Sequence, residues 1–294
     1  MCKEIEANSA NSTTSASSLR WKILSRSLHS DNESELGIKR ISRKENQLDG
    51  SRDATLCYTL PVPNAPTLIL HQRVDSMAHL NDFEVCNRYD IDNTGLVCQW
   101  PSEDVLAHYC LSHESIFRQK RVIELGSGYG LAGLVVAMTM EALEVFISDG
   151  NPQVVDYLEH MYAAVDSLGY GSTEVKPLML HWGQDQVSDI SNRFNIIIAS
   201  DCTFFKEFHA ALVRTIKSLL KKEGPSEAIL FCPNRGDSLD KFLLEVKNSG
   251  LHFQADEILD AEVWRRHQHF VDGDDSWPNY EMDHCYPLLI RIMR

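Results

Sequence analysis

One stretch decides the fold: Val122-Ile123-Glu124-Leu125-Gly126-Ser127-Gly128-Tyr129-Gly130-Leu131-Ala132-Gly133. An apolar run breaks into a glycine-rich turn and resumes as a helical pattern, which is typical of a buried parallel strand that leads into a helix. The first amides of such a helix lack partners within the helix and face a ligand. The stretch therefore predicts the floor of a nucleotide-type cofactor site.

The spacing of the glycines distinguishes between cofactors. A dinucleotide fingerprint, G-x-G-x-x-G, needs a third glycine for close packing of helix on strand, and this chain has Leu131 there. The pattern E-x-G-x-G-x-G is complete instead, from Glu124 to Gly130. Such a loop suits a bulky group with little negative charge, and Glu124 could pair with an ammonium. A tight turn without a ligand is the alternative.

Length and composition limit the class of protein. The 294 residues, 43% hydrophobic and 24% charged, are those of an ordinary globular protein with one large or two small domains. No apolar stretch approaches the roughly 18 residues that span a bilayer. The formal charge of −14 argues against nucleic-acid binding, whose footprint is basic. We therefore expect neither nucleic acid nor a membrane as a partner.

The eight cysteines stand singly, without a C-x-x-C pair, so the sequence indicates neither a zinc ribbon nor a redox dithiol. Without a secretory apolar segment, scattered cysteines are typical of reduced thiols in the cytosol or nucleus, where we expect the protein. His267 and His269 are a candidate metal pair, but no further ligands occur at a recognised spacing. We expect no metal.

Residues 1–52 are rich in serine, asparagine and charge, a composition that predicts disorder over most of this segment. Within it, residues 20–28 predict a basic amphipathic helix with Trp21, Leu24 and Leu28 on one face. Such a helix can dock on an acidic groove or an anionic membrane. A helix packed on its own domain, or an organelle presequence, is the alternative.

Residues 53–113 predict a small β or lid region and an entry helix. Short strands are expected at 68–70 and 83–85, and an extended segment at 96–99. Pro101 and Ser102 predict the start of a helix that ends near Leu111. Trp100, at the mouth of this helix, is a candidate wall of the cofactor pocket or a core anchor.

Strand and helix alternate over residues 114–294, which predicts a parallel sheet covered by helices on both faces. Ligands of such sheets bind at the carboxyl ends of the strands. The last two strands, near 253–259 and 286–293, are expected to follow each other without a helix between them. The other expected strands are 122–125, 144–149, 174–180, 194–201 and 228–232, and the expected helices are 131–140, 153–168, 208–220 and 239–248.

Polar and aromatic residues follow the predicted strand ends. Asp149 ends the second strand, where a carboxylate can accept two hydrogen bonds from a ribose diol; a turn or cap role is the alternative. Trp182 follows the third strand and can stack on an adenine, or lie on the surface. Ser200 and Asp201 end the fourth strand.

Four segments together resemble the family of non-histone protein lysine methyltransferases: N-T-G-x-V-C-x-W-P-S-E at 93–103, E-L-G-x-G at 124–128, D-G-N at 149–151 and A-S-D-C-x-F at 199–204. The resemblance implies the class I methyltransferase fold, an α/β seven-stranded mostly parallel sheet closed by an antiparallel hairpin. It implies S-adenosyl-L-methionine as cofactor. The implied cofactor-binding residues are Trp100, Glu124, Gly126, Ser127, Gly128, Asp149, Asn151, Trp182 and Ser200.

Three further stretches, at 21–24, 101–111 and 286–290, are similar to the branch of this family that modifies calmodulin. The similarity implies calmodulin as the protein substrate, trimethylation of a lysine, and a monomer. Between residues 20 and 44, seven Lys/Arg stand against three Asp/Glu, so this segment is the expected docking arm for an acidic substrate. Another acceptor, an NAD-binding oxidoreductase and a catalytically silent interaction module stay open as alternatives.

Asp201 and Phe204 are the predicted acceptor-site residues. Family members often carry D-x-x-Y here, whereas this chain has D-C-T-F at 201–204. A free lysine, with a pKa of about 10.4, must lose its proton before methyl transfer. Asp201 is expected to orient the lysine nitrogen or receive its proton, and Phe204 and Phe205 to wall the channel. For Asp201, a turn cap is the alternative.

Overall fold

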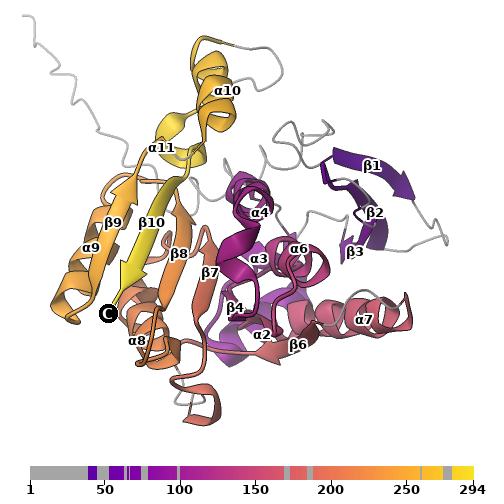
Figure 1. Cartoon of the computed structure of the whole chain (residues 1–294), viewed down its shortest axis with the longest axis horizontal. Coiled ribbons are helices and arrows are strands. Elements are labelled where there is room, and N and C mark those ends of the chain that lie inside the picture. Colours follow the sequence, from indigo (N-terminus) through magenta and orange to yellow (C-terminus); the bar gives the residue numbers. More distant parts are fainter. Residues whose placement is uncertain are drawn as a thin grey trace, which may run out of the picture.

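The computed structural model describes residues 39–44, 53–62, 65, 67–73, 79–97, 100–168, 173–183, 188–258, 260–273 and 280–294. The predicted basic helix at 20–28 lies outside these residues. The described ranges hold a three-stranded antiparallel sheet and a seven-stranded sheet (Figure 1). None of their helices is long and apolar enough to cross a membrane.

The seven-stranded sheet has the order β6-β5-β4-β7-β8-β10-β9. Neighbours from β6 to β8 are parallel, and β10 runs antiparallel to both β8 and β9. The expected mostly parallel sheet is therefore confirmed. Its strands are β4 Arg121–Leu125, β5 Glu144–Asp149, β6 Glu174–Met179, β7 Ile196–Ser200, β8 Glu227–Cys232, β9 His252–Asp256 and β10 Leu288–Met293.

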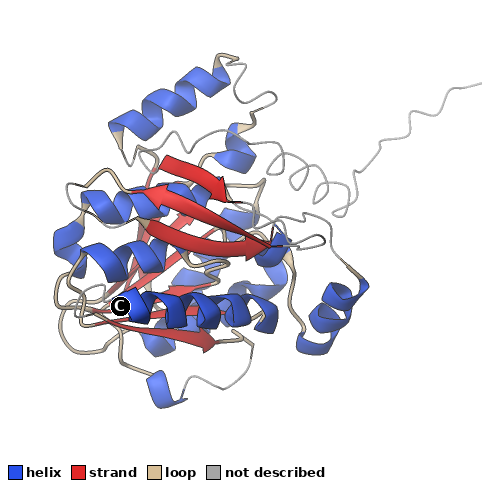
Figure 2. Cartoon of the chain, turned by 90° about the vertical axis from the view of Figure 1, so that its right-hand side faces the viewer, coloured by secondary structure: helices blue, strands red, loops and turns tan. Residues whose placement is uncertain are grey.

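Helices cover both faces of this sheet, because successive residues of a buried strand point to opposite sides. On β4, Val122 packs into one hydrophobic cluster and Ile123 into another. Figure 2 shows the helices in blue around the strands in red. The first cluster contains residues of α4 Pro101–Ser112, α6 Leu131–Thr139 and α7 Pro152–Leu168; the second contains residues of α8 His209–Leu219 and α9 Ser238–Asn248.

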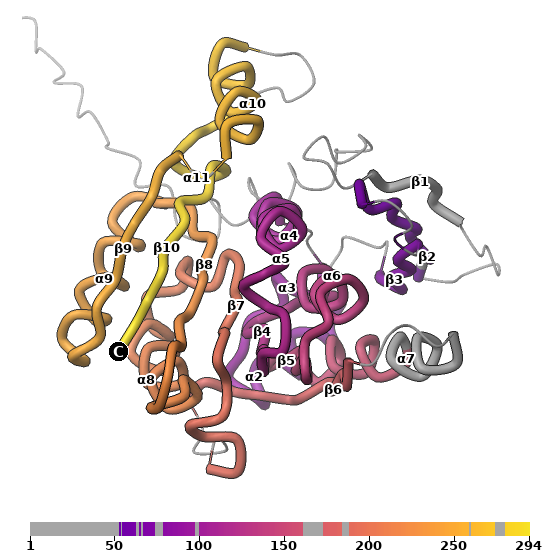
Figure 3. The backbone as a smooth tube through the Cα atoms, viewed as in Figure 1, coloured from indigo at the N-terminus to yellow at the C-terminus, as the bar shows by residue number. Residues whose placement is uncertain are grey.

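The smaller sheet precedes the core and is formed by β1 Lys39–Lys44, β2 Asp53–Thr59 and β3 Leu68–Arg73. β1 lies within residues 1–52, the segment for which the sequence predicts disorder over most of its length. The Tyr129 hydroxyl, in the glycine-rich loop, donates to the carbonyl of Leu96 at 2.6 Å and accepts from the amide of Arg73 at 3.1 Å. The small sheet is thus tied to the glycine-rich loop, and Figure 3 shows β3 beside α6, the helix that follows this loop.

Two short elements differ from the sequence-based expectations. A helix, α2 Leu80–Tyr89, replaces the strand predicted at 83–85, because the Asp82 carboxylate accepts from the His79 amide at 2.7 Å and caps the helix start. A single turn, α3 Thr94–Val97, replaces the first half of the extended segment expected at 96–99, because Asp92 accepts from the Thr94 amide at 2.7 Å. Residues 98 and 99 lie outside the described ranges. A short helix, α5 Glu114–Phe117, follows α4.

The prediction of two final strands without a helix between them is wrong. Two helices, α10 Ala261–Val271 and α11 Met282–Cys285, separate β9 from β10 and extend beyond the sheet (Figure 1). Asp260 caps α10 by accepting from two amides, and Val263 and His267 are buried one turn apart. His267 contacts the Tyr280 hydroxyl at 2.9 Å. Among the residues that the structure describes, no cluster of three or more metal-ligating side chains occurs.

Candidate functional site

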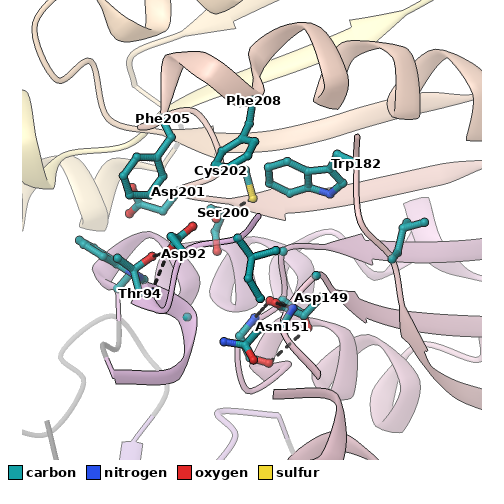
Figure 4. Close-up of a pocket in the computed structure, with 18 of the residues that line it drawn as sticks. Asp92, Thr94, Asp149, Asn151, Trp182, Ser200, Asp201, Cys202, Phe205 and Phe208 are labelled. Carbon is teal, nitrogen blue, oxygen red and sulfur yellow. Dashed lines mark hydrogen bonds between the residues drawn. The ribbon is translucent and has the colours of Figure 1, made fainter. Parts of the chain in front are cut away.

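A pocket lies at the carboxyl ends of the parallel strands, the edge at which the sequence predicts a ligand site (Figure 4). Loops after β4, β5, β6 and β7 line it, together with residues before and within α4. Two predicted site residues, Glu124 and Phe204, do not line it. The predicted residues that do are Trp100, Gly126, Ser127, Gly128, Asp149, Asn151, Trp182, Ser200 and Asp201.

The glycine-rich loop is compact because its glycines take backbone angles that other residues avoid. Gly126 and Gly128 have φ of 59° and 51°. A Cβ on Gly126 would lie 2.8 Å from the Cys202 sulfur and 3.1 Å from the Trp182 ring. Glycine at 126 therefore lets the chain pass directly beneath these two pocket-lining side chains.

Asp149 joins two loops at one end of the pocket. Its carboxylate accepts from the Gly128 amide at 3.0 Å and from the Asn151 amide at 2.9 Å. Burial raises the pKa of Asp149 to about 6. The adjacent Asn151 accepts from the Gln153 amide, but its own buried side-chain nitrogen donates to no described residue. A carboxylate beside an unused buried donor suits a ligand with hydroxyls and acceptor atoms.

Glu124 differs from the role predicted for it. The side chain is 1% exposed, and its carboxylate accepts from the Gly133 amide at 2.8 Å, so it satisfies an orphan donor in the first turn of α6. Burial and the neighbouring Glu103 raise the pKa of Glu124 well above its ordinary value. Because this side chain points into α6 and not into the pocket, the expectation that it pairs with a ligand ammonium is corrected.

Glu103 lines the pocket and was not among the predicted site residues. It lies in the first turn of α4 and accepts from the Leu131 amide at 3.0 Å, so it contacts the start of α6. Burial and the neighbouring Asp104 raise the pKa of Glu103 to about 8. The only signal in the sequence was its place at the end of the W-P-S-E motif.

Asp201 is held by two partners. Its carboxylate forms an ion pair with Arg235, in which both side chains are 4% exposed, and accepts from the Ser102 hydroxyl at 2.8 Å. The Arg235 guanidinium lies over the rings of Trp100 and Phe204, 5.0 and 5.1 Å from their centroids. Nothing in the sequence indicated Arg235, because its partners come from distant segments.

Aromatic side chains form the other end of the pocket. Phe205 and Phe208 line it, whereas the predicted Phe204 packs behind them against Arg235. The rings of Trp182, Phe208 and Phe205 follow one another edge to face, with centroids 6.4 and 6.2 Å apart. Figure 4 shows these three rings on one side of the pocket and Asp149 and Asn151 on the other.

The charge of the pocket distinguishes between the cofactors that the glycine pattern left open. No lysine or arginine occurs among the described lining residues. The charged side chains that line it are Asp90, Asp92, Glu103, Asp149 and Asp201. This lining disfavours the pyrophosphate of a dinucleotide and suits a cofactor that carries ammonium and sulfonium charges.

Comparison with known proteins agrees with this chemistry. Residues 89–249 match the family described as lysine methyltransferase. A calmodulin-lysine N-methyltransferase of Arabidopsis thaliana is 56% identical over 297 residues, which cover 95% of this chain and 97% of the relative. The mouse (Mus musculus) protein-lysine N-methyltransferase EEF2KMT is 26% identical over 175 residues, 55% of this chain and 51% of the relative.

A solved structure of an S-adenosylmethionine-dependent methyltransferase from Mesorhizobium loti is similar at a TM-score of 0.46 and 14% identity, covering 63% of this chain and 98% of that chain.

The family match covers more than half of the chain, and the Arabidopsis relative is similar over nearly the whole of it. The chain therefore belongs to the lysine methyltransferase family.

Proposed function

We propose that this enzyme transfers methyl groups from S-adenosylmethionine to a lysine of calmodulin, and that the reaction continues to trimethyllysine. The observation that carries the proposal is the 56% identity, over nearly the full length of both chains, to a calmodulin-lysine N-methyltransferase. The acidic pocket supports it, because both the cofactor and the acceptor lysine bring positive charge.

The residues present fit the cofactor. Asp149 would hold the ribose hydroxyls, the Asn151 side-chain amide would donate to the nucleoside, and Trp182 would pack on the adenine. The loop from Gly126 to Gly128 would lie beneath the sulfonium group. When bound, S-adenosylmethionine supplies a methyl group on a positively charged sulfur.

The chain's own residues must present the acceptor lysine as a neutral amine. A slot walled by Phe205 and Phe208 disfavours the ammonium form, since burial in apolar surroundings lowers a lysine pKa. Asp201 would orient the lysine nitrogen through an oxygen lone pair. Because Asp201 is paired with Arg235, it acts here as a hydrogen-bond acceptor of low net charge and not as a free base.

We also propose that the enzyme works as a monomer in the cytoplasm and nucleus. Support for a reducing compartment comes from the cysteines in the described ranges, which are all free thiols. The basic segment from residue 20 to residue 44 would provide the docking arm for calmodulin, and removing it should weaken binding in a salt-dependent manner.

The test is incubation of the full chain with labelled S-adenosylmethionine and calmodulin, followed by mass mapping of the product. We expect label on one calmodulin lysine and none when that lysine is replaced by arginine. Transfer to other proteins but not to calmodulin would indicate a different acceptor. Binding of both ligands without transfer would indicate a silent interaction module.

A further inference from the structure

We propose that Glu103 is a cofactor-binding residue whose carboxylate pairs with the α-ammonium group at the methionine end of S-adenosylmethionine. The inference rests on the cofactor assignment and is independent of calmodulin as acceptor. It gives to Glu103 the role that the sequence suggested for Glu124.

The position of Glu103 follows from the strand order. In the sequence β6-β5-β4-β7, Trp182 follows β6, Asp149 ends β5 and the glycine-rich loop follows β4. A ligand with its adenine at Trp182 and its ribose at Asp149 must place its methionine end above β4 and β7. Glu103 lies there, because it accepts from Leu131, which follows the loop after β4, while the adjacent Ser102 bonds to Asp201 after β7.

One oxygen of the Glu103 carboxylate is available to a ligand. Oε1 accepts from the Leu131 amide at 3.0 Å, and Oε2 has no hydrogen bond or ion pair within the described ranges. The residue is only 8% exposed, so water replaces a partner poorly, and an unpaired buried carboxylate is costly. A cationic group of a ligand at the pocket wall would remove that cost.

The charges around Glu103 favour a cation there. Asp104, which follows it on α4, is an acidic neighbour. The nearby Arg235 is already paired with Asp201, which Ser102 links to α4. Burial and Asp104 raise the pKa of Glu103 to about 8, so in the free protein at pH 7 the group holds a proton that a bound ammonium would displace.

Calorimetry with three ligands tests the proposal on the full chain. S-adenosylmethionine carries the ammonium and the sulfonium, S-adenosylhomocysteine carries only the ammonium, and methylthioadenosine carries neither. Glu103→Gln retains the bond to Leu131. We expect this variant to bind S-adenosylmethionine and S-adenosylhomocysteine more weakly by a similar factor, roughly tenfold or more, and to bind methylthioadenosine with an affinity within about twofold of the unaltered protein.

Two other outcomes would overturn the proposal. A loss confined to S-adenosylmethionine would place Glu103 at the sulfonium, and an equal loss for all three ligands would make it a structural residue of α4 and α6. Glu124→Gln is the matched control, since it changes a buried acid bonded to α6 but outside the pocket, and it should affect the three ligands alike.

Proton release provides a second measurement that does not depend on the stability of the variant. Titrations of S-adenosylmethionine into the unaltered protein at pH 7, in buffers of different ionisation enthalpy, should show release of close to one proton from Glu103. Methylthioadenosine should release none. The same uptake or release for both ligands would contradict the assignment.

Discussion

The two ends of the pocket are built in different ways. At the cofactor end, the Asp149 carboxylate accepts from the amide of Asn151, two residues later, and from the amide of Gly128 in the loop after β4. At the acceptor end, the Asp201–Arg235 pair combines the loop after β7 with the loop after β8, and α4 adds Ser102. The first end is formed by turns at the ends of the adjacent strands β4 and β5, whereas the second depends on packing between more distant segments. We therefore expect substitutions at the first end to change cofactor affinity and substitutions at the second to change the free energy of unfolding.

The largest expected effect is on stability at the acceptor end. Arg235→Met would leave the Asp201 carboxylate buried without its partner and should lower the free energy of unfolding by about 3–5 kcal/mol. Urea denaturation of Arg235→Met, Asp201→Asn and the double variant measures this. The double variant should be more stable than Arg235→Met, because the buried unpaired charge is gone. If the loss of stability in the double variant equalled the sum of the losses in the two single variants, the two residues would not be coupled.

At the cofactor end, the effect should appear in affinity. Asp149→Ala removes the acceptor for the ribose hydroxyls and should weaken S-adenosylmethionine binding by about 1.5–3 kcal/mol, as measured by calorimetry. Glu227→Gln is a suitable control, because Glu227 forms an ion pair with Arg291 in the sheet and does not line the pocket. Unchanged affinity in Asp149→Ala would remove the ribose assignment.

The glycine-rich loop allows a matched comparison of backbone and contact effects. Gly126 and Gly250 both have positive φ, 59° and 79°, but a Cβ at Gly250 would meet nothing within 4 Å. Alanine at either position should cost about 1 kcal/mol of stability through the backbone. Only Gly126→Ala should also lower cofactor affinity, because its Cβ would displace Cys202 and Trp182. Equal affinities for the two variants would show that the loop tolerates the clash.

The same contrast explains what could be predicted from the sequence. The strands from β4 to β8 and the site residues at their ends were predicted, because buried apolar runs and turn residues are local signals. The Arg235 site, the helix α10 and the direction of the Glu124 side chain could not be predicted. Each of these depends on contacts between distant segments, as when Asp283 of α11 accepts from the amide of Arg235 at 2.8 Å.

Local signals also failed where capping outweighed propensity. The run Phe83-Glu84-Val85 has β-prone residues at its ends, yet it lies in the middle of α2, because Asp82 caps that helix and forms a buried ion pair with Arg73 at 2.9 Å. Of the two rings expected to wall the channel, Phe205 lines the pocket together with Phe208, whereas Phe204 does not, because the polypeptide turns sharply after β7, where Asp201 has φ of 58°. The sequence therefore predicts an aromatic wall correctly, but one of its two rings comes from Phe208 and not from Phe204.

The dependence of cofactor binding on pH separates the contribution of Glu103 from that of Asp149. Both carboxylates must be ionised to receive the cofactor, and burial raises their pKa values to about 8 and about 6. Affinity for S-adenosylmethionine should therefore rise with pH from pH 6 to pH 7, by about ninefold through Glu103 and about twofold through Asp149, roughly 17-fold together. In Glu103→Gln the rise should fall to about twofold, which leaves the part due to Asp149. Calorimetry of both proteins at pH 6, 6.5 and 7 measures the difference. If affinity rose equally with pH in the unaltered protein and in Glu103→Gln, Glu103 would keep its proton when the cofactor binds. It would then not pair with the ammonium group while Asp149 holds the ribose hydroxyls.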